Sequence, residues 1–130
     1  MKFKPAFLLI EDNLIDQLVI NQLLKKVLDV TDVNIANNGR EAIQWLNNNQ
    51  DLNRSLIILM DIQMPIMNGF DFLNAYDQFN EEFKKTNQIY VLSSTLDRDE
   101  IKRIQENNYV DGFLNKPLQI EDFKMQLVNN

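Results

Sequence analysis

Five short runs rich in apolar residues recur along the chain, each followed by polar or turn-forming residues. They cover residues 6–10, 33–36, 56–60, 89–92 and 112–115. The run at 56–60, LIILM, shows no polar alternation, which is typical of a strand that is covered on both faces. It stops at Asp61, and Pro65, Asn68 and Gly69 then supply turn chemistry. We therefore predict five strands at these positions, with 56–60 at the centre of the sheet.

Apolar residues at helical spacing follow each predicted strand. In the first predicted helix the buried stripe would consist of Ile15, Val19, Leu23 and Val27, joined by Ile20 and Leu24. The third helix would fade out near residue 80 into an exposed loop that contains lysines. The fourth would begin near Asp97 and turn Ile101 and Ile104 inward.

The alternation of five strands and five helices predicts an α/β fold with a doubly wound parallel sheet and helices on both faces. A chain of 130 residues has room for one domain and no second one, so we expect a single domain, 1–130, without an output domain. All parallel strands of such a sheet end at one edge, where the ligand and reaction sites of open α/β sheets lie.

The composition limits which side chains can bind a metal or take part in a reaction. The chain has no cysteine and no histidine, which excludes thiolate metal sites and the commonest general base and leaves carboxylates, lysine and hydroxyls. A net charge of −6 argues against direct contact with nucleic acid. No apolar run reaches the length of a membrane span, and the N-terminus leads directly into a strand pattern instead of a signal peptide. We expect a cytoplasmic protein that does not contact a membrane.

Polar residues of complementary chemistry end four of the predicted strands. They are Glu11, Asp12, Asp61, Ser93 and Lys116. Two carboxylates about 4 Å apart repel by roughly 4 kcal/mol at an effective dielectric constant near 20, so three of them need a cation or shifted pKa values. Oxygen ligands with room for water suit Mg²⁺. A carboxylate nucleophile, a metal, a lysine and a hydroxyl together fit phosphoryl transfer.

Taken singly, these residues also have structural interpretations. Asp12 and Asn13 precede a predicted helix and would cap its start. Asp61 would be an ordinary loop aspartate, and Ser93 and Ser94 would satisfy backbone groups at a strand end. These interpretations do not account for the acids, the hydroxyl and the lysine all falling at one edge of the sheet.

Four segments that close predicted strands carry a resemblance to a known family. They are LLIEDN at 8–13, LMDIQMPIMNG at 59–69, YVLSS at 90–94 and GFLNKP at 112–117. In this order they resemble the receiver domains of two-component response regulators over nearly the whole chain, here of the stand-alone, single-domain type. The resemblance implies a flavodoxin-like (βα)5 fold with the strand order 2-1-3-4-5.

The resemblance also implies roles for individual residues around a bound Mg²⁺. Asp61 corresponds to the phospho-acceptor and is itself part of the metal site. Asp12 corresponds to a direct metal ligand, Glu11 to its acidic neighbour that acts through water, and Gln63 to the residue whose backbone carbonyl completes the metal shell. Glu11 stands where aspartate is more usual, which lengthens the reach to the metal.

Three further residues are assigned by the same resemblance. Ser93 corresponds to the hydroxyl that bonds the phosphoryl group, although serine stands where threonine is common and Ser94 is one residue away. Lys116 corresponds to the lysine that pairs with the phosphoryl group, and its bond to Pro117 to a cis peptide. Phe113 corresponds to the aromatic switch residue and would act by packing alone. By themselves, Phe113 would be a core residue and the Lys-Pro pair a turn.

The implied function is a signalling switch that accepts a phosphoryl group on Asp61 from a histidine kinase or a histidine phosphotransfer protein. It would catalyse only its own phosphorylation and dephosphorylation, and would present a changed surface to a downstream effector protein. An interaction module that works without phosphorylation is the alternative. A phosphatase is disfavoured because Gln63 stands where a second carboxylate would be needed, and a flavin site because glycine-rich phosphate loops are missing.

Overall fold

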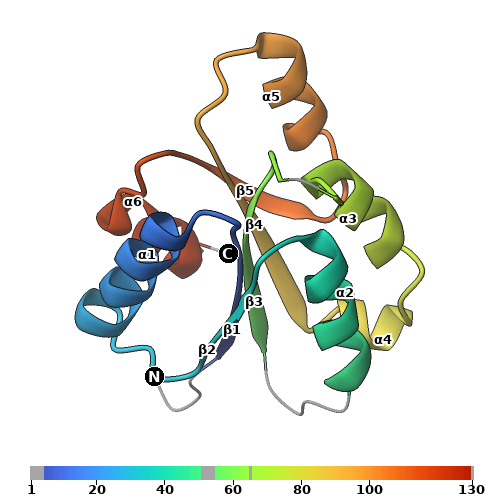
Figure 1. Ribbon diagram of the computed structural model, residues 1–130, viewed down its shortest axis with the longest axis horizontal. Coiled ribbons are helices and arrows are strands. Elements are labelled where there is room, and N and C mark those ends of the chain that lie inside the picture. The colour runs from blue at the N-terminus through green and yellow to red at the C-terminus, as the bar shows by residue number, and fades with distance from the viewer. Residues whose placement is uncertain (1–4, 51–54, 65, 130) are drawn as a thin grey trace.

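The computed structural model describes residues 5–50, 55–64 and 66–129 (Figure 1). Pro65, which we expect in the turn after Asp61, lies outside the described residues. The strands are β1 (Ala6–Ile10), β2 (Val33–Ala36), β3 (Leu56–Asp61), β4 (Asn87–Ser93) and β5 (Val110–Asn115). The helices are α1 (Leu14–Val27), α2 (Gly39–Asn48), α3 (Gly69–Tyr76), α4 (Glu81–Lys84), α5 (Arg98–Gln105) and α6 (Ile120–Asn129).

The strands form one parallel sheet in the order β2-β1-β3-β4-β5, which confirms the predicted fold class and topology. β3 lies in the middle and pairs with β1 on one side and β4 on the other. All six of its residues are buried, as its continuous apolar sequence predicts. β4 and β5 each begin two residues earlier than predicted, at Asn87 and Val110.

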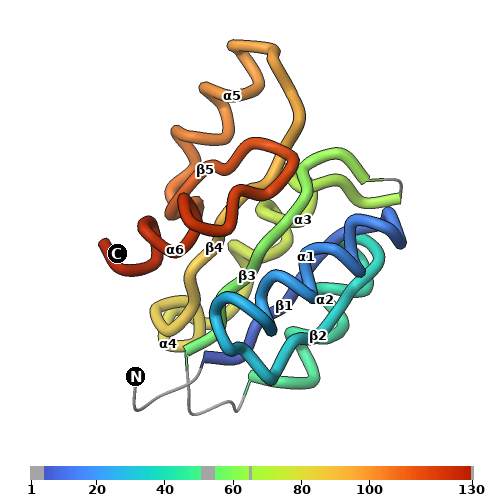
Figure 2. The backbone as a smooth tube through the Cα atoms, turned by 90° about the vertical axis from the view of Figure 1, so that its left-hand side faces the viewer, coloured from blue at the N-terminus to red at the C-terminus, as the bar shows by residue number. Residues whose placement is uncertain are grey.

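Helices cover both faces of the sheet. α1 and α6 lie on one face and α2, α3 and α4 on the other, as Figure 1 shows, and α1 and α6 face the viewer in Figure 2. The first layer buries Ile20, Leu24 and Phe123 against the sheet. On the other face, α2, α3 and α4 bury more apolar side chains than α1 and α6 do, and Ile104 of α5 joins them. The core is therefore divided by the sheet into two separate clusters.

The predicted buried stripe of α1 is wrong in part. Ile15 is 72% exposed and Val19 is 48% exposed, whereas Ile20 and Leu24 are buried together with Gln17. The helix carries apolar residues on most of its circumference, so their spacing alone does not select one face. The Gln17 side chain helps to fix the rotation of the helix, since its Nε2 donates to the backbone oxygen of Glu11 at 2.5 Å.

The expectation of an exposed, lysine-containing loop after α3 is also wrong. Residues 81–84 form the short helix α4, and Lys84 is buried. Its Nζ donates to the backbone oxygen of Asp77 at 2.8 Å and to the Tyr109 hydroxyl at 3.0 Å, and it pairs with Glu81 at 2.8 Å. The lysine is buried because these partners satisfy its ammonium group.

Among the helices of the described residues, none is long and apolar enough to cross a membrane.

Candidate functional site

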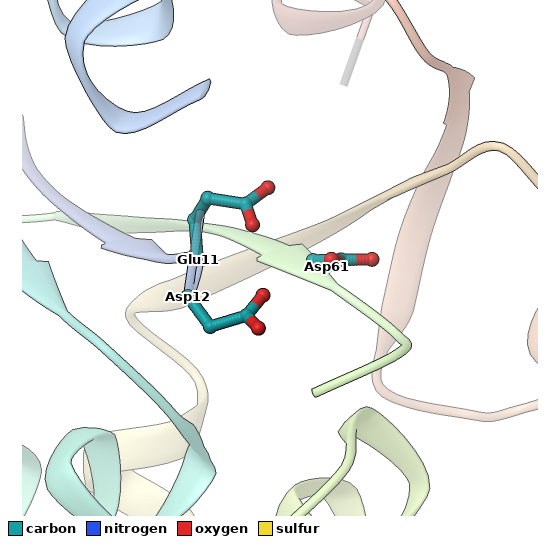
Figure 3. Close-up of side chains that lie close together, drawn as sticks. All are labelled: Glu11, Asp12 and Asp61. Carbon is teal, nitrogen blue, oxygen red and sulfur yellow. The ribbon is translucent and has the colours of Figure 1, made fainter. Parts of the chain in front are cut away.

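Three carboxylates meet where β1 and β3 end. Glu11 and Asp12 directly follow β1, and Asp61 is the last residue of β3. Since β1 and β3 are paired up to Ile10 and Met60, the acids that follow these residues emerge side by side. One carboxylate oxygen from each acid lies within 4.8 Å of those of the other two, and Figure 3 shows the three groups directed into the same space. The sequence predicts this convergence.

Lys116 reaches the same crevice from the end of β5. Its Nζ donates to Glu11 Oε1 at 2.7 Å, to Asp16 Oδ2 at 3.2 Å and to Asp61 Oδ2 at 3.3 Å. A single ammonium group thus serves three carboxylates, while Asp12 adds a fourth negative charge close by. The net charge of this cluster is negative.

Burial raises the pKa of both enclosed carboxyl groups. For Glu11 the loss of hydration outweighs the hydrogen bonds from Lys116 and from the Asn13 backbone, and the charge of Asp61 adds to the increase. For Asp61 burial likewise outweighs the hydrogen bond from the Gln63 backbone and the charge of Lys116. Burial by itself lowers the pKa of Lys116, but its carboxylate partners raise it overall. The site therefore favours additional positive charge.

The donor set fits a hard divalent cation. Glu11, Asp12 and Asp61 offer carboxylate oxygens, and one of the three, Asp12, is exposed, which leaves room for water in the coordination shell. Mg²⁺ usually takes one or two carboxylates and completes its shell with water and phosphate oxygens. These three acids are the residues that would hold it.

The capping interpretation is correct for Asn13 and wrong for Asp12, and Asp61 ends β3 instead of lying in a loop. Asn13 is the N-cap of α1, because its Oδ1 accepts from the backbone nitrogen of Asp16 at 2.9 Å. The backbone nitrogen of Asn13 in turn donates to Glu11 Oε2 at 3.0 Å. Asp61 Oδ1 accepts from the backbone nitrogen of Gln63 at 3.2 Å. These local bonds fix the orientation of the carboxylates of Glu11 and Asp61.

Ser93 and Ser94 lie in different environments. Ser93, the last residue of β4, is buried, and Ser94 is exposed. The Ser93 hydroxyl accepts from the backbone nitrogen of Thr95 at 3.1 Å, so it also satisfies the strand end. Its backbone oxygen accepts from the backbone nitrogen of Lys116 at 3.0 Å, which ties the ends of β4 and β5 together.

The remaining two assigned positions lie on β5 and in the loop after it. Phe113 is half-buried and packs against the apolar cluster on the α2, α3 and α4 face of the sheet. The peptide bond between Lys116 and Pro117 is cis, as the resemblance implies.

Asp16 is the site residue that the sequence reasoning missed. It lies in the first turn of α1, and its carboxylate contacts Lys116. Its spacing from Asp12 gives no signal for this contact, because Asp12 precedes the N-cap Asn13 and is not part of the helix.

Comparison with known proteins agrees with this geometry. The sequence profile of the family described as "Response regulator receiver domain" matches residues 7–128. The chain belongs to this family of receiver domains. Among solved structures, this receiver domain is similar to a response regulator receiver protein from Dyadobacter fermentans, with 29% identity, a TM-score of 0.86 and 95% of each chain covered. A two component response regulator from Cytophaga hutchinsonii is 25% identical, with a TM-score of 0.87 over 98% of this chain and 96% of that one.

Several curated relatives of the receiver domain are much longer proteins. The autoinducer 1 sensor kinase/phosphatase LuxN of Vibrio campbellii is 32% identical over 126 residues, which are 96% of this chain but 13% of that protein. Hybrid signal transduction histidine kinase A of Dictyostelium discoideum is 29% identical over 94% of this chain and 5% of its own length. The probable methanogenesis regulatory protein FilR2 of Methanothrix harundinacea is 26% identical over 90% of this chain and 75% of its own length.

Proposed function

We propose that this receiver domain is a signalling switch that accepts a phosphoryl group on Asp61. The observation that carries the proposal is the position of this carboxylate, which lies beside the acids Glu11 and Asp12 and 3.3 Å from the ammonium group of Lys116. The same crevice thus offers a nucleophile, ligands for a divalent cation and a cation that can bind phosphoryl oxygens.

The donor is a histidine kinase or a histidine phosphotransfer protein, a choice supported by the kinase relatives. A carboxylate oxygen of Asp61 attacks the phosphorus atom of the donor's phosphohistidine. The new P–O bond forms as the P–N bond breaks, and the electron pair of that bond stays on the imidazole nitrogen, which takes up a proton from solvent. These 130 residues contain no histidine, so the phosphohistidine that donates the group lies outside them.

The residues around Asp61 have distinct roles in this step. The residues that would hold Mg²⁺ are Glu11, Asp12, Asp61 and, through its backbone carbonyl, Gln63. When bound, the ion would supply positive charge to offset the charge that develops on the phosphoryl oxygens. Lys116 binds one phosphoryl oxygen, and the Ser93 hydroxyl leaves the backbone of Thr95 to bind another. A phosphoryl group adds about −1.5 to −2 charges, which is why both contacts strengthen once it has been transferred.

The output is a change of the surface formed by α5, β5 and α6. The movement of Ser93 makes room on β4, and Phe113 on the neighbouring strand repacks into it. Ser93 and Phe113 lie on paired strands, where Phe113 is the partner of Val91, two residues before Ser93. The result is a shift between two packing arrangements, and a downstream effector protein binds one of them more tightly.

Labelling with a small phosphodonor tests the acceptor. The protein is incubated with acetyl phosphate and Mg²⁺, and the addition of a phosphoryl group is followed by intact-protein mass spectrometry. We expect one phosphoryl group on the wild type and none on Asp61→Asn. Asp71→Asn, which changes an exposed aspartate at the start of α3, is the matched control and should label fully. Full labelling of Asp61→Asn would overturn the assignment, and a wild type that never labels would favour the interaction module.

A further inference from the structure

Three helices of this chain begin with the same pair of residue types. Each has asparagine at the N-cap, whose side chain accepts from the backbone nitrogen three residues on, and an acid at that third position: Asn13 and Asp16 in α1, Asn38 and Glu41 in α2, Asn68 and Asp71 in α3. In α3 the acid turns back and completes a capping box, with Asp71 Oδ2 accepting from the Asn68 backbone nitrogen at 3.4 Å. In α2, Glu41 Oε1 also turns back and accepts from the Asn37 backbone nitrogen at 3.1 Å.

Asp16 departs from this pattern. The backbone nitrogen of the α1 N-cap, Asn13, donates to Glu11 Oε2 at 3.0 Å, so the group that an acid at the third position usually binds is already satisfied. The Asp16 carboxylate points instead to Lys116, whose Nζ lies 3.2 Å from its Oδ2. The acid that would normally stabilise the helix start is thus used to hold the lysine of the candidate site.

The lysine has no donor to spare. An ammonium group carries three N–H bonds, and Lys116 directs its Nζ at three carboxylates, those of Glu11, Asp16 and Asp61. Phosphorylation converts the Asp61 carboxylate to an acyl phosphate, so the N–H now directed at Asp61 Oδ2 turns to a phosphoryl oxygen. The ammonium group shifts with it, which weakens one of its two other contacts, that with Glu11 or that with Asp16. The contact that is weakened determines which segment of the protein responds to phosphorylation.

We propose that Asp16 is a positioning residue for Lys116, which holds the ammonium group toward α1 before phosphorylation and releases it to the phosphoryl group afterwards. This inference rests on the proposed function of Asp61 as the acceptor. Asp16 thereby opposes the phosphorylated state, because the contact with the phosphoryl group forms at the expense of the contact with Asp16.

Burial decides that Asp16, and not Glu11, is the partner released. The Glu11 side chain is 1% exposed and its Oε1 lies 2.7 Å from the lysine Nζ, so separating the two leaves an acceptor oxygen that water cannot reach. The Asp16 side chain is 42% exposed, so water can replace the lysine at small cost. The lysine therefore keeps its bond to Glu11 and gives up its contact with Asp16 as it shifts with the phosphoryl oxygen.

The structure has room for this shift. A cavity of about 290 Å³ lies between α1 and the loop that follows β5, and Asp16, Lys116 and Pro117 are among the residues that line it. The lysine side chain can move within this space, and water can enter to solvate the freed carboxylate. The inference therefore needs no change in the backbone of either element.

Binding of a phosphoryl analogue tests the competition. Beryllofluoride is titrated into the Mg²⁺-loaded protein, and the dissociation constant is measured by isothermal titration calorimetry. We expect Asp16→Asn and Asp16→Ala to bind the analogue about two- to fivefold more tightly than the wild type, the range of a partly exposed ion pair. Asp16→Glu should restore a value close to that of the wild type, since it keeps the charge. Asp71→Asn alters the same helix position away from the site and should leave the constant unchanged.

A second measurement uses the metal-free protein without any phosphoryl analogue. The ¹⁵N signal of the Lys116 ammonium group should move in Asp16→Asn and stay in place in Asp71→Asn. Equal or weaker analogue binding by Asp16→Asn, or an unmoved Lys116 signal, would overturn the role of Asp16. Failure of the wild type to bind the analogue at all would instead contradict the proposed acceptor, so the two failures are distinguishable.

Discussion

The ammonium group of Lys116 lies 2.7 Å from Glu11 Oε1, although the two residues are 105 positions apart in the chain. This ion pair joins the end of β1 to the end of β5 across the intervening strands. It is therefore both a part of the candidate site and a tertiary contact that holds the edge of the sheet together.

Replacing this lysine should destabilise the fold. In Lys116→Met the buried carboxylate of Glu11 loses its counter-charge, and we expect the free energy of unfolding to fall by about 1–3 kcal/mol, less than for a fully buried pair because the lysine is partly exposed. Urea unfolding of the metal-free protein measures the change. Lys124→Met, at an exposed position of α6, is the matched control, and an equal effect of both substitutions would contradict the importance of the ion pair.

The site should make stability depend on pH. The pKa of Glu11 is raised above 4.5 and that of Asp61 above 3.8 in the folded chain. The folded state thus binds these protons more tightly than the unfolded state does, so their contribution to stability is present at low pH. It is lost as the pH rises from these values through the raised pKa values.

Asp61→Asn checks this dependence. The amide carries no charge at any of these pH values, so the variant should be more stable than the wild type above the raised pKa, by about 1 kcal/mol, and lose this advantage as the pH falls toward 4. Urea unfolding over a pH series measures both curves in the absence of metal. A stability difference that does not change with pH would show that the carboxyl group is not destabilised by burial. Addition of Mg²⁺ should stabilise the wild type more than the variant.

Gly69, the first residue of α3, should not tolerate a side chain. A Cβ atom at this position would lie 2.9 Å from the Cα of Ile62 and 2.5 Å from its Cδ1. Since a backbone atom is involved, Gly69→Ala has to displace the loop after β3, at a cost of about 1–3 kcal/mol. Asn74→Ala, on an exposed position of the same helix, should cost less than 0.5 kcal/mol or be neutral, as surface substitutions are. Thermal unfolding of both variants distinguishes a steric cause from a general effect on the helix.

The hydrogen bonds that join Lys84, Tyr109 and Asp77 near α4 should contribute to stability without affecting phosphorylation of Asp61. The Tyr109 hydroxyl accepts from Lys84 Nζ at 3.0 Å and donates to Asp77 Oδ1. Tyr109→Phe removes both bonds, and we expect a loss of about 1 kcal/mol in urea unfolding. In the double variant with Lys84→Met, the total loss of stability should be smaller than the sum of the two single losses, because both substitutions remove the same contact. Phosphoryl labelling of Asp61 should stay at the wild-type level, and a loss of labelling would show that these hydrogen bonds also affect the candidate site.

Much of the fold can be predicted because the strands of a covered parallel sheet are continuous apolar runs. β1 and β2 have the predicted bounds, and β3 exceeds its prediction only by Asp61. The buried face of α1 could not be predicted, since apolar residues occur around most of the helix and the hydrogen bonds of Gln17 help to select the side. α4 could not be predicted because four residues carry no periodicity, and the burial of Lys84 depends on partners from other elements.

The candidate site could be predicted as far as strand ends define it. Glu11, Asp12, Asp61 and Lys116 follow or end strands, and a parallel sheet brings such positions to one edge regardless of their separation in sequence. Asp16 does not follow a strand. Its contact with Lys116 depends on the direction in which α1 leaves β1, and this direction is fixed by side-chain bonds that an apolar pattern does not contain.

The central position of β3 has a consequence for the motions of the protein. This strand is hydrogen-bonded on both sides and buried on both faces, so its amide hydrogens should exchange with solvent only when the whole domain unfolds. The amides of the loops after β4 and β5 should exchange through local opening. A group attached to Asp61 thus sits on an element that opens only when the whole domain unfolds, and the conformational response has to come from the segments around it.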